Sequence, residues 1–222
     1  MPIEQMPFAL DQRPGMTRAD FVVSASNEEV VSTLDHWPDW AGGALVISGP
    51  AGAGKSHLAA IWRETLGARE IAPERLVGDA VPALVVGTSA IFIDNADRAP
   101  EEPLLHVFNM IVERRGHLLL AARDLPARWS IALPDLRSRL LSSRSVTILP
   151  PDEELLRGVL VKLFSDRQLI VAGDVIGYLV LYLERSYAAA IRAVAALDAA
   201  ALVEGRRVTV PLAKRILGFD SQ

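Results

Sequence analysis

The sequence predicts an α/β domain with a parallel five-stranded sheet, followed by a small all-helical domain. Short apolar runs alternate with amphipathic helical patterns through the first 150 residues, which is typical of a doubly wound sheet. After Pro150-Pro151 helical periodicity takes over, apart from a short strand candidate at Arg207-Val208. Half of the residues are apolar and only 6% are aromatic. The core must therefore be mainly aliphatic, which suits buried parallel strands.

The pattern divides the chain into three expected parts. Residues 1–20 contain a Pro14-Gly15 breaker and no sustained period, so we expect a tail there. Residues 21–150 form the α/β domain, and residues 151–222 form the helical domain. A length of 222 residues fits one large domain with one small addition.

Each element of the α/β domain has its own signal. A capping box, Ser26-Asn27-Glu28-Glu29, predicts the start of a helix that ends at Pro38. Apolar residues at helical spacing predict two more helices, over 57–66 and 104–115. Strands are expected at the short apolar runs 44–48, 84–87, 90–94, 118–122 and 146–149.

The C-terminal part reads as four helices. Asp152 is the expected cap of the first, and the Ala-rich run 188–201 is helical in composition. The expected helices cover 152–164, 174–184, 186–204 and 209–217.

The clearest chemical signal is a glycine-rich octet, which fits the pattern G-x-x-x-x-G-K-[ST] between a predicted strand and a predicted helix. Its residues are Gly49, Pro50, Ala51, Gly52, Ala53, Gly54, Lys55 and Ser56. Glycines let the backbone N–H groups face phosphates, and the helix N-terminus adds positive potential. Lys55 is expected to reach the β- and γ-phosphates, Ser56 to ligate Mg²⁺, and His57 to continue the binding segment. A plain turn with a surface lysine is the alternative, but such an octet arises by chance in on the order of one chain in a hundred.

A strand that ends in a carboxylate supplies the second half of the expected site. Ile91-Phe92-Ile93-Asp94 predicts that Asp94 helps to hold Mg²⁺, although Asp also ends many strands as a turn former. Asn95 follows, where ATPases of this architecture usually have a glutamate. An amide can orient water but cannot take its proton, so we expect weak or no intrinsic ATPase activity.

Composition argues against several classes of function. The chain has no cysteine, which excludes disulfides and thiolate metal sites, and its four histidines lack ligand spacing. A net charge of −4 disfavours a protein that mainly wraps nucleic acid. No apolar run approaches the ~18 residues of a membrane span, and Met1 to Leu10 does not resemble a signal peptide. We therefore expect a cytoplasmic protein without membrane contact.

The order of the motifs resembles the AAA+ module of the replication initiator DnaA. More closely, the chain is similar to the DnaA-related Hda family, of the shorter kind found in alphaproteobacteria, over residues 20–217. The resemblance rests on GPAGAGKS, IFIDNAD, AARDLP at 121–126 and LPDLRSRL at 133–140. It implies an AAA+ fold with a helical lid, and ADP or ATP with Mg²⁺ as ligand. The family's first sensor position usually holds a polar group such as Asp, whereas here it reads Arg123-Asp124, in reversed order. We expect Arg123 to lie against the nucleotide.

The resemblance further implies an arginine finger at Arg139, offered to the nucleotide of a neighbouring molecule. Arg137 and Arg144 lie nearby in the sequence and could substitute. The second sensor arginine of the family aligns with Ala188, and either Arg185 or Arg192, one turn to each side, could replace it.

The same resemblance implies partners. QMPFAL at 5–10 is similar to the family's motif for the sliding clamp of DNA polymerase III, with Gln5, Phe8 and Leu10 as the inserted side chains. The expected function is negative regulation of replication initiation: bound to the clamp, the protein stimulates ATP hydrolysis by DnaA. A stand-alone AAA+ ATPase that loads or remodels a replication protein is the alternative, and a homo-oligomer stays open. Sequence-specific DNA binding is not expected, because the C-terminal helices offer few basic residues.

Overall fold

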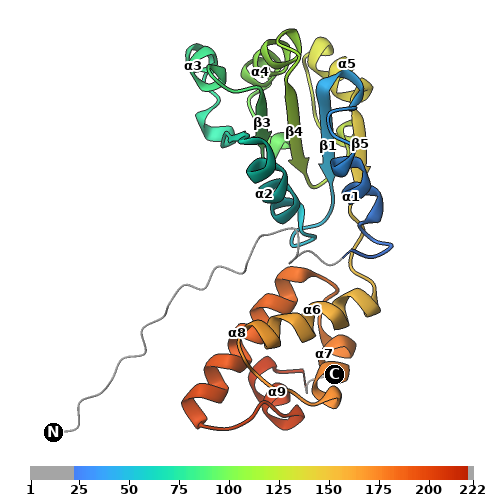
Figure 1. Cartoon of the computed structure of the whole chain (residues 1–222), viewed down its shortest axis with the longest axis vertical. Helices are drawn as coiled ribbons and strands as arrows, with labels where there is room; N and C mark the ends of the chain where they lie inside the picture. Colours follow the sequence, from blue (N-terminus) through green and yellow to red (C-terminus); the bar gives the residue numbers. More distant parts are fainter. Residues whose placement is uncertain (1–22, 220–222) are drawn as a thin grey trace, which may run out of the picture.

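A parallel sheet of five strands forms the centre of the first half of the molecule (Figure 1). The computed structural model describes residues 23–219. The strand order is β2-β3-β4-β1-β5, and the pairings are parallel throughout. The strands are β1 (Ala44–Ser48), β2 (Arg69–Glu70), β3 (Ala90–Ile93), β4 (His117–Ala122) and β5 (Arg144–Thr147). The expected parallel five-stranded sheet is thus confirmed.

Helices cover both faces of this sheet. On one face, Leu45 and Ile47 of β1 pack with α1 (Glu28–Asp35) and α2 (Lys55–Leu66). On the other face, Ala44 and Val46 pack with the remaining helices of this part. Those helices are α3 (Val81–Val85), α4 (Glu101–Glu113) and α5 (Pro134–Ser142). Successive residues of the buried strand therefore serve two separate apolar clusters, as expected of a doubly covered parallel sheet.

Of the five predicted strands, those at 44–48, 90–94 and 118–122 are confirmed as β1, β3 and β4. One prediction was wrong, and one was shifted. The run 84–87 is not a strand: it ends α3, and Gly87 then turns the chain with φ +74°. Val86 in this run is 59% exposed, so it lacks the burial that a central strand would give it. The last strand lies two residues earlier than 146–149, at Arg144–Thr147. The fifth strand is instead β2, which pairs with the edge of β3 and has no apolar run.

The prediction of a capping box at the start of α1 was also wrong, although the helix itself forms. The N-cap is Asn27, and its side chain makes no capping hydrogen bond. The Ser26 hydroxyl bonds instead to the Ser24 hydroxyl at 2.8 Å, and the Ser24 carbonyl accepts the N–H groups of Asn27 and Glu28. A turn that precedes the helix therefore occupies the groups that a capping box would use.

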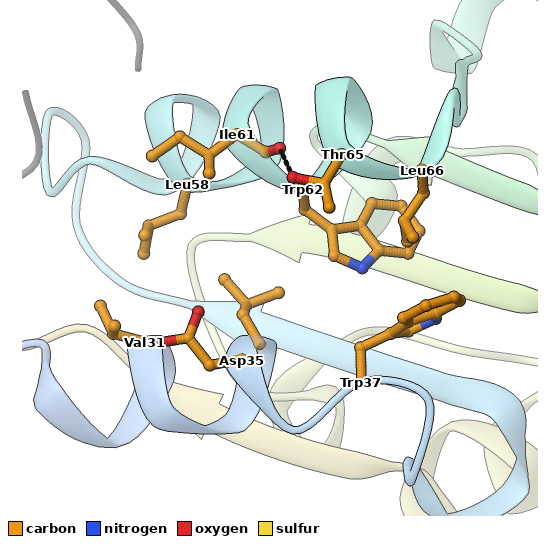
Figure 2. Close-up of a pocket in the computed structure, with 9 residues that line it drawn as sticks. Val31, Asp35, Trp37, Leu58, Ile61, Trp62, Thr65 and Leu66 are labelled. Atoms are coloured by element: carbon orange, nitrogen blue, oxygen red, sulfur yellow. Dashed lines mark hydrogen bonds between the residues drawn. The ribbon is translucent and has the colours of Figure 1, made fainter. Parts of the chain in front are cut away.

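A pocket opens between α1 and α2, on the face of the sheet that these two helices cover (Figure 2). Its apolar walls include Val31, Trp37, Leu58 and Trp62, and Asp35 adds a carboxylate. None of the residues of the glycine-rich octet lines it. The Trp62 indole lies across the pocket from Trp37. It also stacks on the Trp40 ring, with ring centroids 5.4 Å apart. This pocket therefore belongs to helix packing and not to the predicted site.

Four helices form the second half of the described chain and share one apolar core. They are α6 (Glu153–Asp166), α7 (Gly173–Tyr182), α8 (Tyr187–Glu204) and α9 (Val210–Leu217). Three of them have side-chain caps, from Asp152, Ser186 and Thr209. The four expected helices are confirmed, and no strand forms at Arg207-Val208. The domain boundaries at residues 20 and 150 remain predictions.

Within residues 23–219, none of the helices combines the length and the apolar character that a membrane crossing requires.

A matched pair of substitutions tests the core of the helical half. Leu160 of α6 is fully buried, whereas its neighbour Val161 is 52% exposed. Leu160→Ala leaves a cavity and should lower the free energy of unfolding by about 2–5 kcal/mol. Val161→Ala should change it by less than about 0.5 kcal/mol, because the side chain already contacts water. Urea denaturation of the two variants measures the difference, and equal losses would contradict this assignment of the core.

Candidate nucleotide-binding site

The glycine-rich octet connects the end of β1 to the start of α2. Gly49, Gly52 and Gly54 all have positive φ, at 154°, 73° and 96°. Two of them also lack space for a side chain: a Cβ on Gly49 would lie 2.7 Å from the Ile148 carbonyl oxygen, and one on Gly52 would lie 2.6 Å from Cβ of Ala188. Glycine is therefore required both for the backbone conformation and for the close packing around the loop.

Lys55, the first residue of α2, folds back over this loop. Its Nζ donates to the carbonyl oxygens of Gly49 at 2.6 Å and Pro50 at 2.9 Å. Partial burial lowers the pKa of Lys55, the charge of Arg123 lowers it further, and Asp94 and Asp97 act in the opposite direction. An anion bound in the loop would stabilise this ammonium group and receive its hydrogen bonds.

The two predicted magnesium holders meet at this edge of the sheet. The Ser56 hydroxyl donates to Oδ2 of Asp94 at 3.0 Å, although 38 positions separate the two residues. Oδ1 of Asp94 accepts the N–H of Asn95 at 2.8 Å. A hydroxyl and a carboxylate are oxygen ligands of the kind that Mg²⁺ prefers, in combination with phosphate oxygens and water. In the described chain no group of three or more His, Asp or Glu side chains gathers to hold a metal. An ion here would need ligands from the nucleotide.

Arg123 follows β4, which lies between β1 and β3 in the sheet. It is therefore placed between the glycine loop, which follows β1, and Asp94, which follows β3. Its carbonyl accepts the N–H of Gly49 at 3.1 Å, and its charge acts on Lys55. Asp124 is directed elsewhere: its carboxylate accepts from Arg128 at 3.4 Å, within the turn that follows. Of the Arg123-Asp124 pair, only Arg123 therefore contributes its charge to the loop.

Asn95 and Asp97 form the turn after Asp94. Asn95 is exposed and has a left-handed backbone (φ 50°), which asparagine tolerates better than most residues. Asp97 lies in a single 3₁₀ turn, Ala96–Arg98, and its charge raises the pKa of Lys55. The sequence analysis did not assign Asp97 to the site, since an Asp after a strand is common in turns.

The lid helix α8 begins directly on the glycine loop. The backbone N–H of Tyr187 donates to the Gly52 carbonyl oxygen at 3.0 Å, and Nδ2 of Asn27 donates to the Tyr187 hydroxyl at 3.4 Å. Burial raises the pKa of Tyr187 to about 12, so the phenol is neutral at ordinary pH. The sequence analysis missed Tyr187. The available signal was its position immediately after Ser186, the cap of the helix on which a sensor residue was expected.

Comparisons with known proteins agree with this arrangement. Residues 153–217 match the family described as "Hda, lid domain". The match covers the four helices of the second half of the chain, α6 to α9.

Solved structures show the same fold at low sequence identity. Domain III of the Thermotoga maritima replication initiation protein DnaA matches with a TM-score of 0.81 and 19% identity, over 95% of this chain and 99% of that chain. AMPPCP-bound DnaA from Aquifex aeolicus matches with a TM-score of 0.69 and 16% identity, over 87% and 67%. The Holliday junction branch migration motor RuvB of Thermotoga maritima matches with a TM-score of 0.73 and 17% identity, over 92% and 72%.

Ala188, which the sequence analysis aligned with a sensor arginine, lies in the first turn of α8. It is in contact range of Gly52, so a residue at this point of α8 faces the loop. The candidate replacements Arg185 and Arg192 are both exposed, and within residues 23–219 neither forms an ion pair or a side-chain hydrogen bond. Their role at a nucleotide remains a prediction.

Arg139 lies on α5, exposed to solvent, with its guanidinium carbon 5.9 Å from the centroid of the Phe108 ring. Among the described residues, its side chain forms no hydrogen bond or ion pair with the glycine loop of its own chain. Arg137 is also exposed, whereas Arg144 donates to the Thr33 hydroxyl at 3.2 Å and so is tied to α1. Gln5, Phe8 and Leu10 lie outside the described residues.

Removal of the Lys55 ammonium group tests the site. Lys55→Ala should abolish the rise in thermal midpoint that ADP with Mg²⁺ gives the parent, because a ligand stabilises a protein only in proportion to its binding. The control Lys162→Ala removes a lysine from α6 and should keep the full rise. Thermal unfolding with increasing ADP measures both, and a Lys55→Ala protein that ADP still stabilises fully would overturn the assignment.

Proposed function

We propose that this protein binds ADP or ATP with Mg²⁺ in its glycine loop and acts in the cytoplasm as a negative regulator of DnaA. The observation that carries the proposal is the joining of Ser56 to Asp94 beside a loop on which the Hda-type lid rests. A DnaA structure with the same fold holds AMPPCP, an adenine nucleotide analogue, which supports this class of ligand.

Each side chain of the site has a distinct role in this proposal. The backbone of Gly49 to Gly54 and the start of α2 receive the phosphates, and Lys55 changes its hydrogen bonds from the loop carbonyls to them. Ser56 and Asp94 hold Mg²⁺, which neutralises phosphate charge. Arg123 and His57 are the remaining polar side chains assigned to the nucleotide site. Asn95 orients water without accepting its proton, so hydrolysis by the protein itself is weak.

The regulatory step uses a different surface. Bound to the sliding clamp of DNA polymerase III through Gln5, Phe8 and Leu10, the protein presents Arg139 to ATP held by DnaA. The exposure of Arg139 supports this role, since a finger that serves a neighbouring molecule must be accessible. A stand-alone ATPase is the less favoured alternative, because Asn95 and Ala188 replace the groups that such a motor uses. Self-association is compatible with both.

The arginine finger can be tested apart from binding. A finger stabilises charge that develops in the transition state, so Arg139→Ala should bind ADP and the clamp normally but fail to stimulate DnaA. Fingers in other systems supply about 10³–10⁵ in rate; a smaller loss is expected here because DnaA retains its own activity. Arg139→Lys should not restore stimulation, because lysine lacks the planar fork. Single-turnover hydrolysis of ATP-bound DnaA, with clamp on DNA, is the measurement.

Arg137→Ala, two positions away on the same helix, serves as the matched control and should keep most of the stimulation. Full stimulation by Arg139→Ala would remove the finger assignment. If the parent protein gave no stimulation at all, the regulatory proposal itself would fail.

The tail motif is tested by replacing Gln5, Phe8 and Leu10 together with alanine. These side chains supply the apolar and amide contacts of the proposed clamp peptide, so clamp binding should be lost. The ADP-induced rise in thermal midpoint should stay unchanged, since the octet is intact. Surface plasmon titration on immobilised clamp measures the loss, and equal affinity of parent and triple variant would show that the motif is a coincidence.

A further inference from the structure

The lid carries a groove at the end of α8 that is remote from the glycine loop. α8 starts at the loop with Tyr187 and continues for 18 residues. At about 1.5 Å per residue, its last turn lies roughly 27 Å from its start. The groove is formed by the connection between α6 and α7, the last turn of α8 and the connection between α8 and α9. It is therefore separate from the candidate nucleotide site.

Apolar side chains line this groove, and another exposed apolar side chain is adjacent to it. Leu169 and Val208 pack onto the lid core and form its base. Ile170 and Leu202 line it as well, but they are 92% and 73% exposed, and the adjacent Val203 is 85% exposed. A single exposed aliphatic residue is ordinary on a protein surface, whereas a group of them around a groove marks an interaction site.

The side-chain charges of the groove that have no ion-pair partner are positive. Asp198 is the carboxylate that lines it, and this side chain already pairs with Arg167 at 3.6 Å. Glu204, which precedes Gly205 in the sequence, pairs with Arg215. Arg206 and Arg207 also line the groove, and both are exposed. Neither guanidinium has an ion pair or hydrogen-bond partner among residues 23–219. A partner that complements the groove must therefore bring negative charge together with apolar surface.

We propose that this groove binds a segment of another protein in which large apolar side chains stand next to Asp or Glu. The groove volume is about 590 Å³, which suits a few inserted side chains. Two free arginines are fewer than the ~4–8 basic residues typical of anionic membrane surfaces. Exposed aliphatic side chains contribute little to nucleic-acid binding, which depends on phosphate contacts. The proposal does not depend on the function proposed for the glycine loop.

Peptide selection on the full chain tests this docking surface. Random peptides of roughly 12 residues, long enough to span such a groove, are selected on the immobilised parent protein and then measured singly by fluorescence anisotropy. Selected peptides should be enriched in Asp or Glu beside Leu or Phe. Arg206→Glu with Arg207→Glu, or Ile170→Ser with Leu202→Ser, should weaken their binding by at least about tenfold.

Two control variants make similar changes of charge and apolar surface on the α/β half. Arg75→Glu reverses an exposed charge there, and Val77→Ser with Val86→Ser removes two exposed valines. Both should change affinity by less than about twofold, as expected of substitutions outside a contact. Thermal unfolding checks that each variant is folded, and Arg206→Gln with Arg207→Gln provides a milder variant that should also weaken binding.

Three results would overturn the proposal. The selection could yield no enrichment of acidic and apolar residues. The selected peptides could bind the groove variants as tightly as the parent. Alternatively, phosphatidylserine vesicles or single-stranded DNA could bind in a manner that depends on Arg206 and Arg207 while the peptides do not.

Discussion

The contact between Gly52 and the start of α8 is the constraint on which the rest of this molecule depends. A side chain at position 52 would collide with Ala188, so the helix reaches the loop backbone only because Gly52 has none. The N–H of Tyr187 then donates directly to the Gly52 carbonyl. The lid is thereby fixed at the same loop that is proposed to hold phosphates.

The sheet determines which side chains can meet at that loop. In the order β2-β3-β4-β1-β5 the strands are parallel, so their carboxyl ends share one edge. Ser56 follows β1 through the octet, Asp94 follows β3, and Arg123 follows β4 between them. The strand order therefore brings these residues together. It places the positive charges of Lys55 and Arg123 beside the Ser56 hydroxyl and the Asp94 carboxylate.

The features proposed to bind a nucleotide are present, whereas two groups that hydrolysis is expected to need are replaced. The loop, Lys55 and the Ser56–Asp94 pair are in place, while an amide follows Asp94 and an alanine faces the loop from α8. Arg139 is exposed on α5 and rests on an aromatic ring of α4. This separation supports the proposal that the protein acts on a nucleotide held by another molecule. The lid adds a second proposed binding surface, the groove lined by Arg206 and Arg207, at the opposite end of α8 from the glycine loop.

Features that depend on a local pattern could be predicted from the sequence alone. The octet, the apolar strands at β1, β3 and β4, and the four lid helices each have a periodicity or spacing that needs no tertiary partner to recognise. Other features depend on contacts between segments that are distant in the sequence. β2 consists of two exposed residues that become a strand by backbone pairing with β3, and backbone pairing leaves no apolar signature. The run 84–87 had that signature but no place in the sheet. Tyr187 entered the site because α8 packs on a glycine more than a hundred residues away in the sequence, and contacts between distant segments are set by the packing of the whole chain.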